Sequence, residues 1–554
     1  MIVLPAALLL LGLGPADEQV NARAARGGRT MVVAEHPDAA RAGSEVLRKG
    51  GNAIDAAVAT AFALAVVYPQ AGNLGGGGFL VARLADGSAS SFDFRERAPL
   101  AAGRDLYLDE KGEVRREAIL YGALAAGVPG SVAGLCLARD RLGSKPLAEL
   151  LAPAIALAEE GFLVDPHLSD DLDRHARHLS RFPEAARIFL PGGKTPPPGA
   201  RLRQPDLARV LRAIAKKGPK GFYEGETAER LVEGVREGGG IWTLEDLSQY
   251  RAVERPPLRG AYRGLEILTM GPPSGGGVTL LQSLRVLEGF DLAGSGFGSS
   301  RSIHLLSETF RWAFADRARH LGDADFVEVP LDRLLSKERA DGIRAEIDPE
   351  RASARAPVSA GGSRGQTTHL SVVDGERNAV SLTTTINDFF GCHFVAPGTG
   401  FFLNNEMDDF AAKPGTANLY GLSGGEANAI APGKRPLSSM TPTIVSEGGA
   451  VRYVLGSPGG GRIPTSVLQV LVNLVDHRMG VSEAVRAPRI HHQGGGIEGE
   501  RFALSADVRS ALEAMGHRVE DREWFCSVQA IEVRPDGTRL GYSDPRRGGL
   551  AVGD

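Results

Sequence analysis

The sequence predicts a mixed α+β fold in a globular protein. Of its 554 residues, 43% are hydrophobic, which is enough to build a large core. Some stretches carry apolar residues at helical spacing, whereas others show the two-residue alternation of strands. Glycine supplies 72 residues, about twice its usual share, so many tight turns or close backbone approaches are expected. The length corresponds to three or four domains of about 150 residues, or to one large layered domain.

The charge balance points to a small ligand. The 63 Lys and Arg residues nearly match the 67 Asp and Glu residues, which leaves a net charge of −4 and a pI near 6.4. Such a chain has no broad cationic field, so nucleic acid and anionic lipid are not expected as main partners. The three cysteines, Cys136, Cys392 and Cys526, share no metal-ligand spacing and are too few to staple the chain.

The N-terminus predicts a secretory signal. An apolar run from Ile2 to Leu13 is too short to cross a bilayer and is followed by the small residues Gly14 and Ala16. We predict cleavage after Ala16 and a periplasmic or secreted location. No Lys or Arg precedes the run, which leaves a misassigned start or a buried N-terminal segment as alternatives. No later segment is expected to span a membrane.

Helices are expected first, from Pro37 to Val67, in an alanine-rich stretch that is interrupted at Gly50-Gly51-Asn52. Small side chains would let the two resulting helices pack closely. Two strands follow, from Phe79 to Leu84 and from Ser88 to Phe94, around an Asp86-Gly87 turn.

The tetraglycine from Gly75 to Gly78 precedes a strand instead of opening a helix, so we interpret it as a packing turn and not as a phosphate-binding loop. Between about Ser144 and Ile347 the pattern is mostly helical, with no internal repeat. Later, a strand from Val451 to Leu455 leads into GSPGGGR, and a helix is expected from Thr465 to Val475.

A linker and a hairpin are predicted in the centre of the chain. The segment from about Asp348 to Gln366 contains almost no large apolar residues and is expected to be a mobile linker. Two β-rich stretches follow, Thr368 to Val373 and Ala379 to Ile386, joined by a polar loop centred on Glu376. They predict an antiparallel hairpin directly after the linker.

The register of this hairpin follows from its loop. Antiparallel partners have residue numbers with a constant sum, so a loop centred on Glu376 places Thr367 opposite Thr385. Asn387 lies one diagonal step further on the same face. Three polar groups should therefore converge where the linker meets the strand.

Ordered motifs along most of the chain resemble the γ-glutamyltranspeptidase family. They are GGNAIDAAVATAFALAVVYPQAGNLGGGGF, DFRERAP, TTHLSVVD, TTTIN, FFLNNEMDDF, KRPLSSMTPT and GSPGGGR. The resemblance implies an N-terminal-nucleophile hydrolase with a four-layer αββα sandwich. It also implies a precursor that cuts itself into a large subunit, residues 17–366, and a small catalytic subunit, residues 367–554, which stay associated as one domain.

By this resemblance, self-cleavage falls between Gln366 and Thr367, and Thr367 is the catalytic nucleophile. A hydroxyl is a weak nucleophile unless a base takes its proton, and a free α-amino group, with a reference pKa of about 7.7 to 8.0, is suited to that task. Cleavage would create this base. Before cleavage, the same hydroxyl would attack the Gln366 carbonyl to give an ester that water hydrolyses. Without the resemblance, Thr367 and Thr368 would be only the polar start of a strand.

Other catalytic roles also follow from the resemblance. Thr385 would hydrogen-bond the nucleophile and hold its rotamer. Gly459 and Gly460 match the oxyanion hole of the family. Consecutive glycines suit that role, since they let two backbone N–H groups point at one oxygen. Tyr420, in KPGTANLYGLSGGEANAI, matches the aromatic residue of a lid that some members close over the donor.

A γ-glutamyl donor carries an α-ammonium and an α-carboxylate, so its site needs a carboxylate together with a cation or hydroxyl groups. By resemblance, the α-carboxylate would be bound by Arg95, Ser438 and Ser439. The α-ammonium would be bound by Asn387, Glu406 and Asp409.

One segment departs from the family pattern. After NDFFG, where the family has small residues, this chain has Cys392, His393 and Phe394. A Cys-His nucleophile pair is an alternative, but adjacent strand residues point to opposite faces, so we expect the two side chains to be separated. Their bulk would instead alter the rim of the acceptor site.

The predicted function is transfer and hydrolysis of the γ-glutamyl group of glutathione and related amides, with water, an amino acid or a peptide as acceptor. Neither a metal nor an organic cofactor is expected. A glutaryl-amide or cephalosporin-type acylase of the same superfamily is one alternative, against which the ammonium-binding Asp409 argues. A processed but inactive binding protein is another, and the intact Thr367, Thr385 and Gly459-Gly460 disfavour it.

Overall fold

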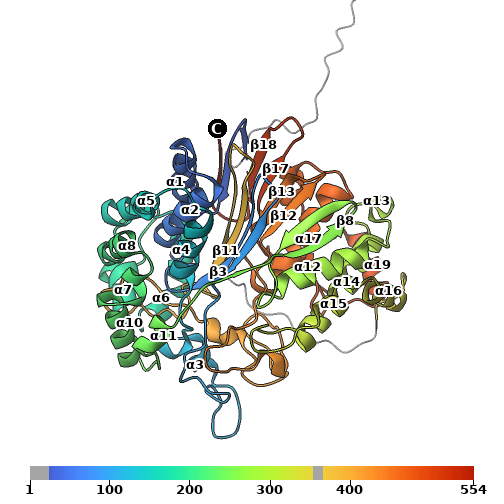
Figure 1. The fold of residues 1–554 in the computed structure, drawn as a ribbon. Helices are drawn as coiled ribbons and strands as arrows, with labels where there is room; N and C mark the ends of the chain where they lie inside the picture. The colour runs from blue at the N-terminus through green and yellow to red at the C-terminus, as the bar shows by residue number, and fades with distance from the viewer. Residues whose placement is uncertain (1–23, 354–365) are drawn as a thin grey trace, which may run out of the picture.

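The computed structural model describes residues 24–353 and 366–554 of the chain (Figure 1). The predicted signal peptide, residues 1–16, and most of the predicted linker lie outside the described residues. Helices and strands both contribute extensively, which confirms the mixed α+β class. Within the described ranges, no helix has the length and apolar character needed to cross a membrane.

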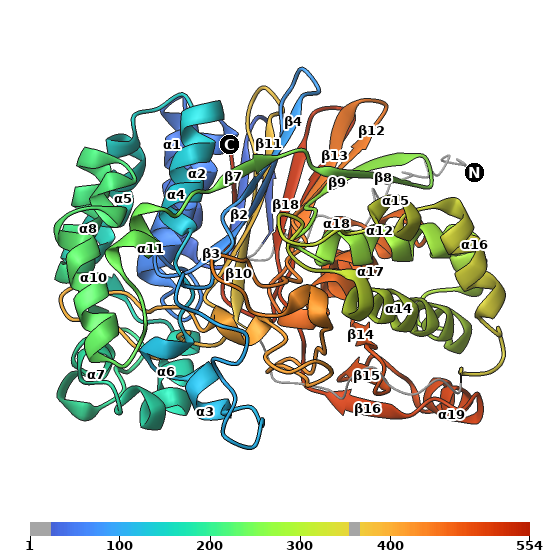
Figure 2. The same cartoon turned by 60° about the horizontal axis from the view of Figure 1, so that its bottom comes forward.

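Two seven-stranded antiparallel sheets are stacked face to face in the centre of the molecule (Figure 2). In spatial order, the first contains β1 (Ala24–Gly27), β18 (Arg539–Ser543), β17 (Gln529–Val533), β13 (Ala450–Gly456), β12 (Thr443–Glu447), β9 (Leu265–Thr269) and β8 (Leu258–Tyr262). The second contains β19 (Leu550–Gly553), β2 (Met31–Ala34), β10 (Thr367–Val373), β11 (Ala379–Thr385), β3 (Gly77–Arg83), β4 (Ala89–Asp93) and β7 (Val253–Arg255). Smaller sheets pair β14 (Ile490–His491), β15 (Ile497–Glu500) and β16 (Val519–Arg522), and β5 (Phe162–Leu163) with β6 (Arg201–Leu202).

Helices flank this pair of sheets on both sides (Figure 2). Beside the second sheet lie α1 (Pro37–Arg48), α2 (Ala53–Val67), α4 (Ser131–Leu142), α5 (Leu147–Glu160) and α8 (Pro205–Lys217). Beside the first lie α12 (Gly276–Leu287), α14 (Ser300–His320), α17 (Ile463–Val475) and α18 (Val481–Arg486). The remaining α-helices of the described ranges are α3 (Arg116–Leu120), α6 (Pro166–Leu179), α7 (Pro183–Phe189), α9 (Lys220–Tyr223), α10 (Glu226–Glu237), α11 (Leu244–Ser248), α13 (Leu292–Ser295), α15 (Leu331–Leu334), α16 (Lys337–Glu346) and α19 (Ala506–Ala514).

The two predicted N-terminal helices are confirmed as α1 and α2, and they pack closely as expected. Asn52 caps α2, because its side chain accepts hydrogen bonds from the backbone N–H groups of Ile54 and Asp55. A Cβ added at Gly43 of α1 would lie 2.1 Å from Oγ1 of Thr60 in α2. Glycine is therefore needed for this helix contact.

The strand β10 is buried on both faces. Its side chains point alternately toward the helices that include α2 and toward the first sheet. Leu370 and Val372 join the apolar core that includes α2. On the opposite face, Ser371 donates a hydrogen bond to the carbonyl of Gln529 in β17, which belongs to the first sheet. Because odd-numbered residues of β10 share this face, Thr367 lies on the side that faces the first sheet.

Several strands within the predicted helical region were not predicted. The region from about Ser144 to Ile347 is mostly helical, as expected, but it also contributes β7, β8 and β9 to the two sheets. These strands have only three to five residues, and β7 and β8 lie at sheet edges. Short edge strands with one exposed face give a weak alternation signal.

Candidate active site

The predicted hairpin register is confirmed. β10 pairs with β11 from Thr367↔Thr385 to Val373↔Ala379. β2 pairs with the other side of β10, but only along Leu370–Val373. The beginning of β10 therefore extends past its neighbour, and the Thr367 side chain, although only 3% exposed, lies at the end of a central strand.

Thr367, Thr385 and Gln366 form one hydrogen-bond network. The two threonine hydroxyl oxygens lie 3.1 Å apart, and the Thr385 hydroxyl donates to the Gln366 carbonyl at 3.1 Å. The backbone N–H of Asn387 donates to the same Thr385 oxygen at 2.8 Å. A hydroxyl has a single proton, and Thr385 gives it to Gln366, so the Thr367 hydroxyl must donate to Thr385.

Asn387 is held by its backbone as well as by its side chain. It has a φ of 75°, a left-handed conformation that asparagine tolerates better than most residues. Its carbonyl accepts a hydrogen bond from the Gln366 N–H at 3.1 Å, and its side-chain amide donates to the carbonyl of Asn405 at 2.9 Å. The predicted convergence of Asn387 with the hairpin end is thus observed.

Sequence reasoning missed Arg547, which contacts the backbone of Thr367. Its Nη1 donates to the Thr367 carbonyl at 3.2 Å and lies 3.6 Å from a Glu35 carboxylate oxygen. Burial raises the pKa of Glu35 to about 7, although Arg547 opposes the shift. The arginine is 180 positions from Thr367, so no local pattern could have found it.

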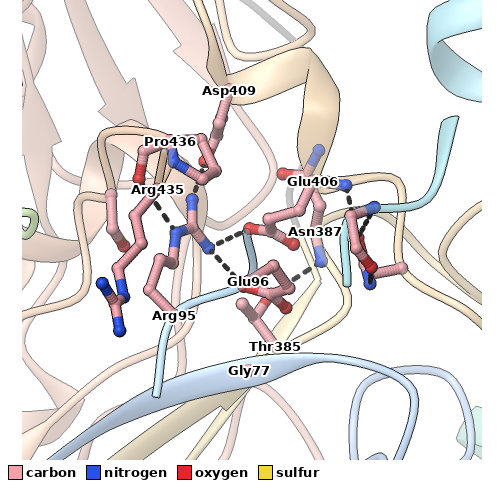
Figure 3. Close-up of polar contacts among 12 residues, drawn as sticks. Gly77, Arg95, Glu96, Thr385, Asn387, Glu406, Asp409, Arg435 and Pro436 are labelled. Carbon is pink, nitrogen blue, oxygen red and sulfur yellow. Dashed lines mark hydrogen bonds and ion pairs between the residues drawn. The ribbon is translucent and has the colours of Figure 1, made fainter. Parts of the chain in front are cut away.

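Arg95 is the centre of a buried charge cluster (Figure 3). Its guanidinium pairs with Glu406 and Asp409, lies 3.4 Å from Glu96, and donates through Nε to the Pro436 carbonyl at 3.2 Å. Residues predicted to bind opposite ends of a zwitterion therefore pair with each other here. A zwitterion could replace these contacts because its ammonium and carboxylate match the two charges.

The electrostatics of the cluster are dominated by the burial of three carboxylates around Arg95. Burial raises the pKa of Glu96 to about 7 and raises that of Glu406 well above its usual range, although Arg95 opposes both shifts. Burial also raises the pKa of Asp409, against the lowering effects of Arg95 and Arg317. An incoming ammonium group would favour the ionised forms.

The structure adds Arg317 to the predicted pair of serines. Arg317, from α14, is 5% exposed and donates to Oγ of Ser439 at 3.1 Å, while Oγ of Ser438 accepts the backbone N–H of Met440. Burial lowers the pKa of Arg317 to about 10, with Asp409 opposing and Arg95 adding to the shift. Its Nε has no hydrogen-bond partner among the described residues.

A sequence signal for Arg317 did exist. Phe310 and Phe314 precede it at helical spacing and are almost completely buried. An arginine on such an apolar helix face is buried with them, and a buried guanidinium requires a polar or anionic partner.

The predicted oxyanion glycines lie between β13 and α17, and neither position accommodates a side chain. Gly459 has a φ of 131° and Gly460 a φ of 58°. A Cβ at Gly459 would lie 2.2 Å from the sulfur of Cys526, and a Cβ at Gly460 would lie 2.7 Å from the ring of Tyr420. The tight fit explains why the turn needs two glycines.

Tyr420 packs against this turn and reaches the hairpin end. It is 4% exposed, and its hydroxyl donates to the Asn387 carbonyl at 2.5 Å. Its backbone carbonyl accepts a hydrogen bond from the Gln493 side chain at 2.9 Å. Tyr420, the predicted lid residue, is therefore buried between the Gly459-Gly460 turn and Asn387.

Cys392 and His393 do not pair, but the predicted reason was wrong. The segment is a turn and not a strand, and His393 has a φ of 61°. The Cys392 thiol lies against the Leu403 carbonyl at 3.3 Å, whereas the His393 ring meets the His175 ring at 3.2 Å. Burial raises the pKa of Cys392 to about 12, which is unsuited to a nucleophile.

The tetraglycine is a close-packing element, as interpreted from the sequence. A Cβ at Gly76 would lie 2.1 Å from the Thr385 carbonyl oxygen, and a Cβ at Gly78 would lie 2.4 Å from that of Thr383. The glycines thus allow a close approach to β11 of the β10–β11 hairpin. Among the described residues, no group of three or more His, Cys, Asp or Glu side chains is arranged to hold a metal ion.

Residues 39–553 match the γ-glutamyltranspeptidase family, and the chain belongs to that family. It is 45% identical over 528 residues to the glutathione hydrolase proenzyme of Escherichia coli (strain K12), with 94% of this chain and 91% of that protein covered.

Two solved structures are also similar. A cephalosporin acylase from Bacillus halodurans has a TM-score of 0.86 at 28% identity and covers 98% of this chain and 99% of its own. The Helicobacter pylori γ-glutamyltranspeptidase has a TM-score of 0.57 at 44% identity and covers 58% of this chain and 92% of its own.

Proposed function

We propose that this chain transfers and hydrolyses the γ-glutamyl group of glutathione and related amides through a γ-glutamyl ester on Thr367. The arrangement of sheets and helices fits the four-layer αββα sandwich of the N-terminal-nucleophile hydrolases. The observation that carries the proposal is the Thr367–Thr385–Gln366 network at the end of a central strand. A secreted or periplasmic location belongs to the same proposal, as do subunits of residues 17–366 and 367–554.

The first reaction is self-cleavage. The Thr367 oxygen attacks the Gln366 carbonyl carbon, and the hydroxyl proton passes to the departing amide nitrogen. Hydrolysis of the resulting ester restores the hydroxyl and leaves a carboxylate on Gln366. The hydrogen bond from Thr385 to the Gln366 carbonyl supports this step, because it polarises the carbonyl that is attacked.

The second reaction uses the free amine of Thr367 as the base. The neutral amine takes the hydroxyl proton, the oxygen attacks the γ-carbonyl of the donor, and the amide nitrogen leaves with a proton. Gly459 and Gly460 would donate to the tetrahedral oxyanion. Water, or the amine of an amino acid or peptide, then attacks the ester and releases Thr367.

Donor recognition distinguishes this function from an acylase. Arg95, Ser438 and Ser439 would hold the α-carboxylate, with Arg317 supporting Ser439. Asn387, Glu406 and Asp409 would hold the α-ammonium. A glutaryl amide lacks that ammonium. The buried carboxylates of the cluster would then gain no positive charge from the substrate, and leaving them without that partner is unfavourable.

The test compares two anilides that differ only in the α-amino group. The γ-glutamyl anilide should be hydrolysed with a kcat/KM at least about tenfold above that of the glutaryl anilide, since one lost ion pair costs about 1.4 kcal/mol or more. Preference for the glutaryl anilide would favour the acylase alternative. Processed protein that cleaves neither would favour the inactive binding protein.

A further inference from the structure

The predicted lid segment, residues 416–423, is attached to the buried charge cluster around Arg95 by a side chain that has no assigned role. The segment is closed by a bridge between Ala417 and Ser423 and carries Tyr420 near its middle. One turn within it is defined by the Asn418 N–H, which donates to the Leu422 carbonyl at 2.9 Å. The side chain of Asn418 makes the contacts that matter for recognition.

Asn418 joins the lid backbone to a catalytic-site carboxylate. Its Oδ1 accepts hydrogen bonds from the N–H groups of Tyr420 and Leu422, both at 3.0 Å. Its Nδ2 donates to Oδ1 of Asp409 at 2.8 Å. The amide orientation is determined, because two backbone donors must face the oxygen and the NH₂ group must then face the carboxylate.

Asp409 is consequently held from two directions. Arg95 binds its Oδ2, and Asn418 binds its Oδ1. These donors come from segments more than 300 positions apart in the chain, and together they fix the plane of the carboxylate. A carboxylate has about four lone-pair sites, so acceptor capacity is left for an ammonium group.

The same amide also determines where Tyr420 lies. The Tyr420 N–H is bound to Asn418, its ring lies against Gly460, and its hydroxyl reaches the Asn387 carbonyl. A rotation of Asp409 would therefore be transmitted through Asn418 to the residue that covers the oxyanion turn.

We propose that Asn418 is a positioning residue that orients Asp409 toward the α-ammonium of the donor and couples this orientation to the shape of the lid. The inference rests on the proposed function and deepens it. It makes preference for α-amino donors depend on a lid residue in addition to the carboxylates that touch the substrate.

The test uses two substitutions at one position. Asn418→Asp keeps an oxygen for the two backbone N–H groups but replaces the donor to Asp409 by a second carboxylate oxygen. Asn418→Ala removes both functions. The matched control is Lys413→Ala, just before the lid segment. It removes an exposed ion pair with Glu113 and does not affect the contacts of Asp409.

Each variant is first checked for two chains on a denaturing gel, and kcat and KM are then measured with a γ-glutamyl anilide. Both Asn418 variants should raise KM about tenfold or more, the change expected for loss of a hydrogen bond to a charged group, with a smaller change in kcat. Lys413→Ala should stay within about twofold of the unsubstituted protein.

If Asn418→Asp has a normal KM while Asn418→Ala has a raised KM, only the hydrogen bonds of Asn418 to the lid backbone matter, and the inference is wrong. Normal kinetics in both, or equal impairment in Lys413→Ala, would also overturn it. If the unsubstituted protein does not hydrolyse the γ-glutamyl anilide at all, the proposed function fails, and this inference fails with it.

Discussion

Thr385 makes three hydrogen bonds with a single hydroxyl group. It donates to the Gln366 carbonyl and accepts from Thr367 and from the Asn387 N–H. Because Thr385 gives its only proton to the Gln366 carbonyl, the proton of Thr367 is directed toward Thr385. The hydroxyl of Thr385 thus orients the Thr367 hydroxyl and polarises the Gln366 carbonyl, which we propose is attacked by Thr367.

The first prediction concerns this hydroxyl. Thr385→Val, which keeps the shape of the side chain, should slow cleavage at Gln366-Thr367 at least about tenfold, equivalent to about 1.4 kcal/mol in the barrier. Thr385→Ser, which restores the hydroxyl, should cleave at close to the normal rate. The rate is measured by gel after synthesis of the precursor. Normal processing of Thr385→Val would remove Thr385 from the mechanism.

The second prediction concerns Arg317, the buried cation beside Ser439. Arg317→Met should lower kcat/KM for a γ-glutamyl anilide by about 10- to 100-fold, because hydrogen bonds from charged groups contribute about 1.5 to 3 kcal/mol. Arg319→Met, on the exposed side of the same helix, is the control and should have little effect. Equal effects of both substitutions, or none from Arg317→Met, would contradict the assignment.

At the scale of single elements, β10 carries a buried histidine between the two sheets. The ring of His369 hydrogen-bonds Thr383 at 2.8 Å and Ser371 at 3.2 Å, and it lies against Gly456 of β13. Burial lowers the pKa of His369 to about 3. The folded protein therefore keeps this ring neutral at a pH where the unfolded chain would bind a proton.

The third prediction follows from that difference. Below the unfolded pKa of about 6.5, His369 binds a proton in the unfolded state but not in the folded state. The free energy of unfolding therefore falls by about 1.4 kcal/mol for each unit by which the pH is lowered, down to about pH 3. Relative to His369→Gln, the unsubstituted protein should lose roughly 2 kcal/mol of unfolding free energy between pH 6.5 and 5. Urea unfolding of both proteins gives this difference, since other titrating groups are shared. A gap that does not change with pH would contradict the assigned burial.

Elements determined by local pattern could be predicted from the sequence. The β10–β11 register needed only the two-residue period and the position of the loop at Glu376, and it was correct for every pair. The turn at Cys392 was mistaken for a strand because Phe390, Gly391 and His393 all have positive φ values. Bulky residues rarely adopt that conformation, so the sequence gives no sign of it.

Site residues that depend on distant contacts were harder to find. Arg317 and Ser439 are 122 positions apart, and Arg547 and Thr367 are 180 apart. Periodicity describes only neighbours along the chain, so these contacts had no local signal beyond the apolar helix face around Arg317. Positions such as Arg95 and Asp409 were named because complete motifs surround them.

At the scale of the whole molecule, each large sheet contains strands from both sides of the proposed cleavage point. β10 and β11 lie between β2 and β3, and β12 lies beside β9. Cleavage of the Gln366-Thr367 bond would break no strand pairing, because Gln366 precedes β10. Separating the two segments would instead break several strand ladders and expose both apolar cores.

The fourth prediction is that the two chains remain associated after cleavage. They should elute together in gel filtration at the size of the full chain and separate only in denaturant. Two separate peaks under native conditions would contradict the prediction that the interleaved strands hold the two chains together after cleavage.

The central claim is that Thr367 becomes the N-terminal nucleophile and carries the γ-glutamyl group. Mass spectrometry of the purified protein, quenched during turnover of a slow γ-glutamyl donor, tests it most directly. The account predicts two chains, one beginning at Thr367, with the γ-glutamyl mass on the peptide that starts there. A γ-glutamyl adduct on any other residue, or turnover by an uncleaved chain, would contradict it.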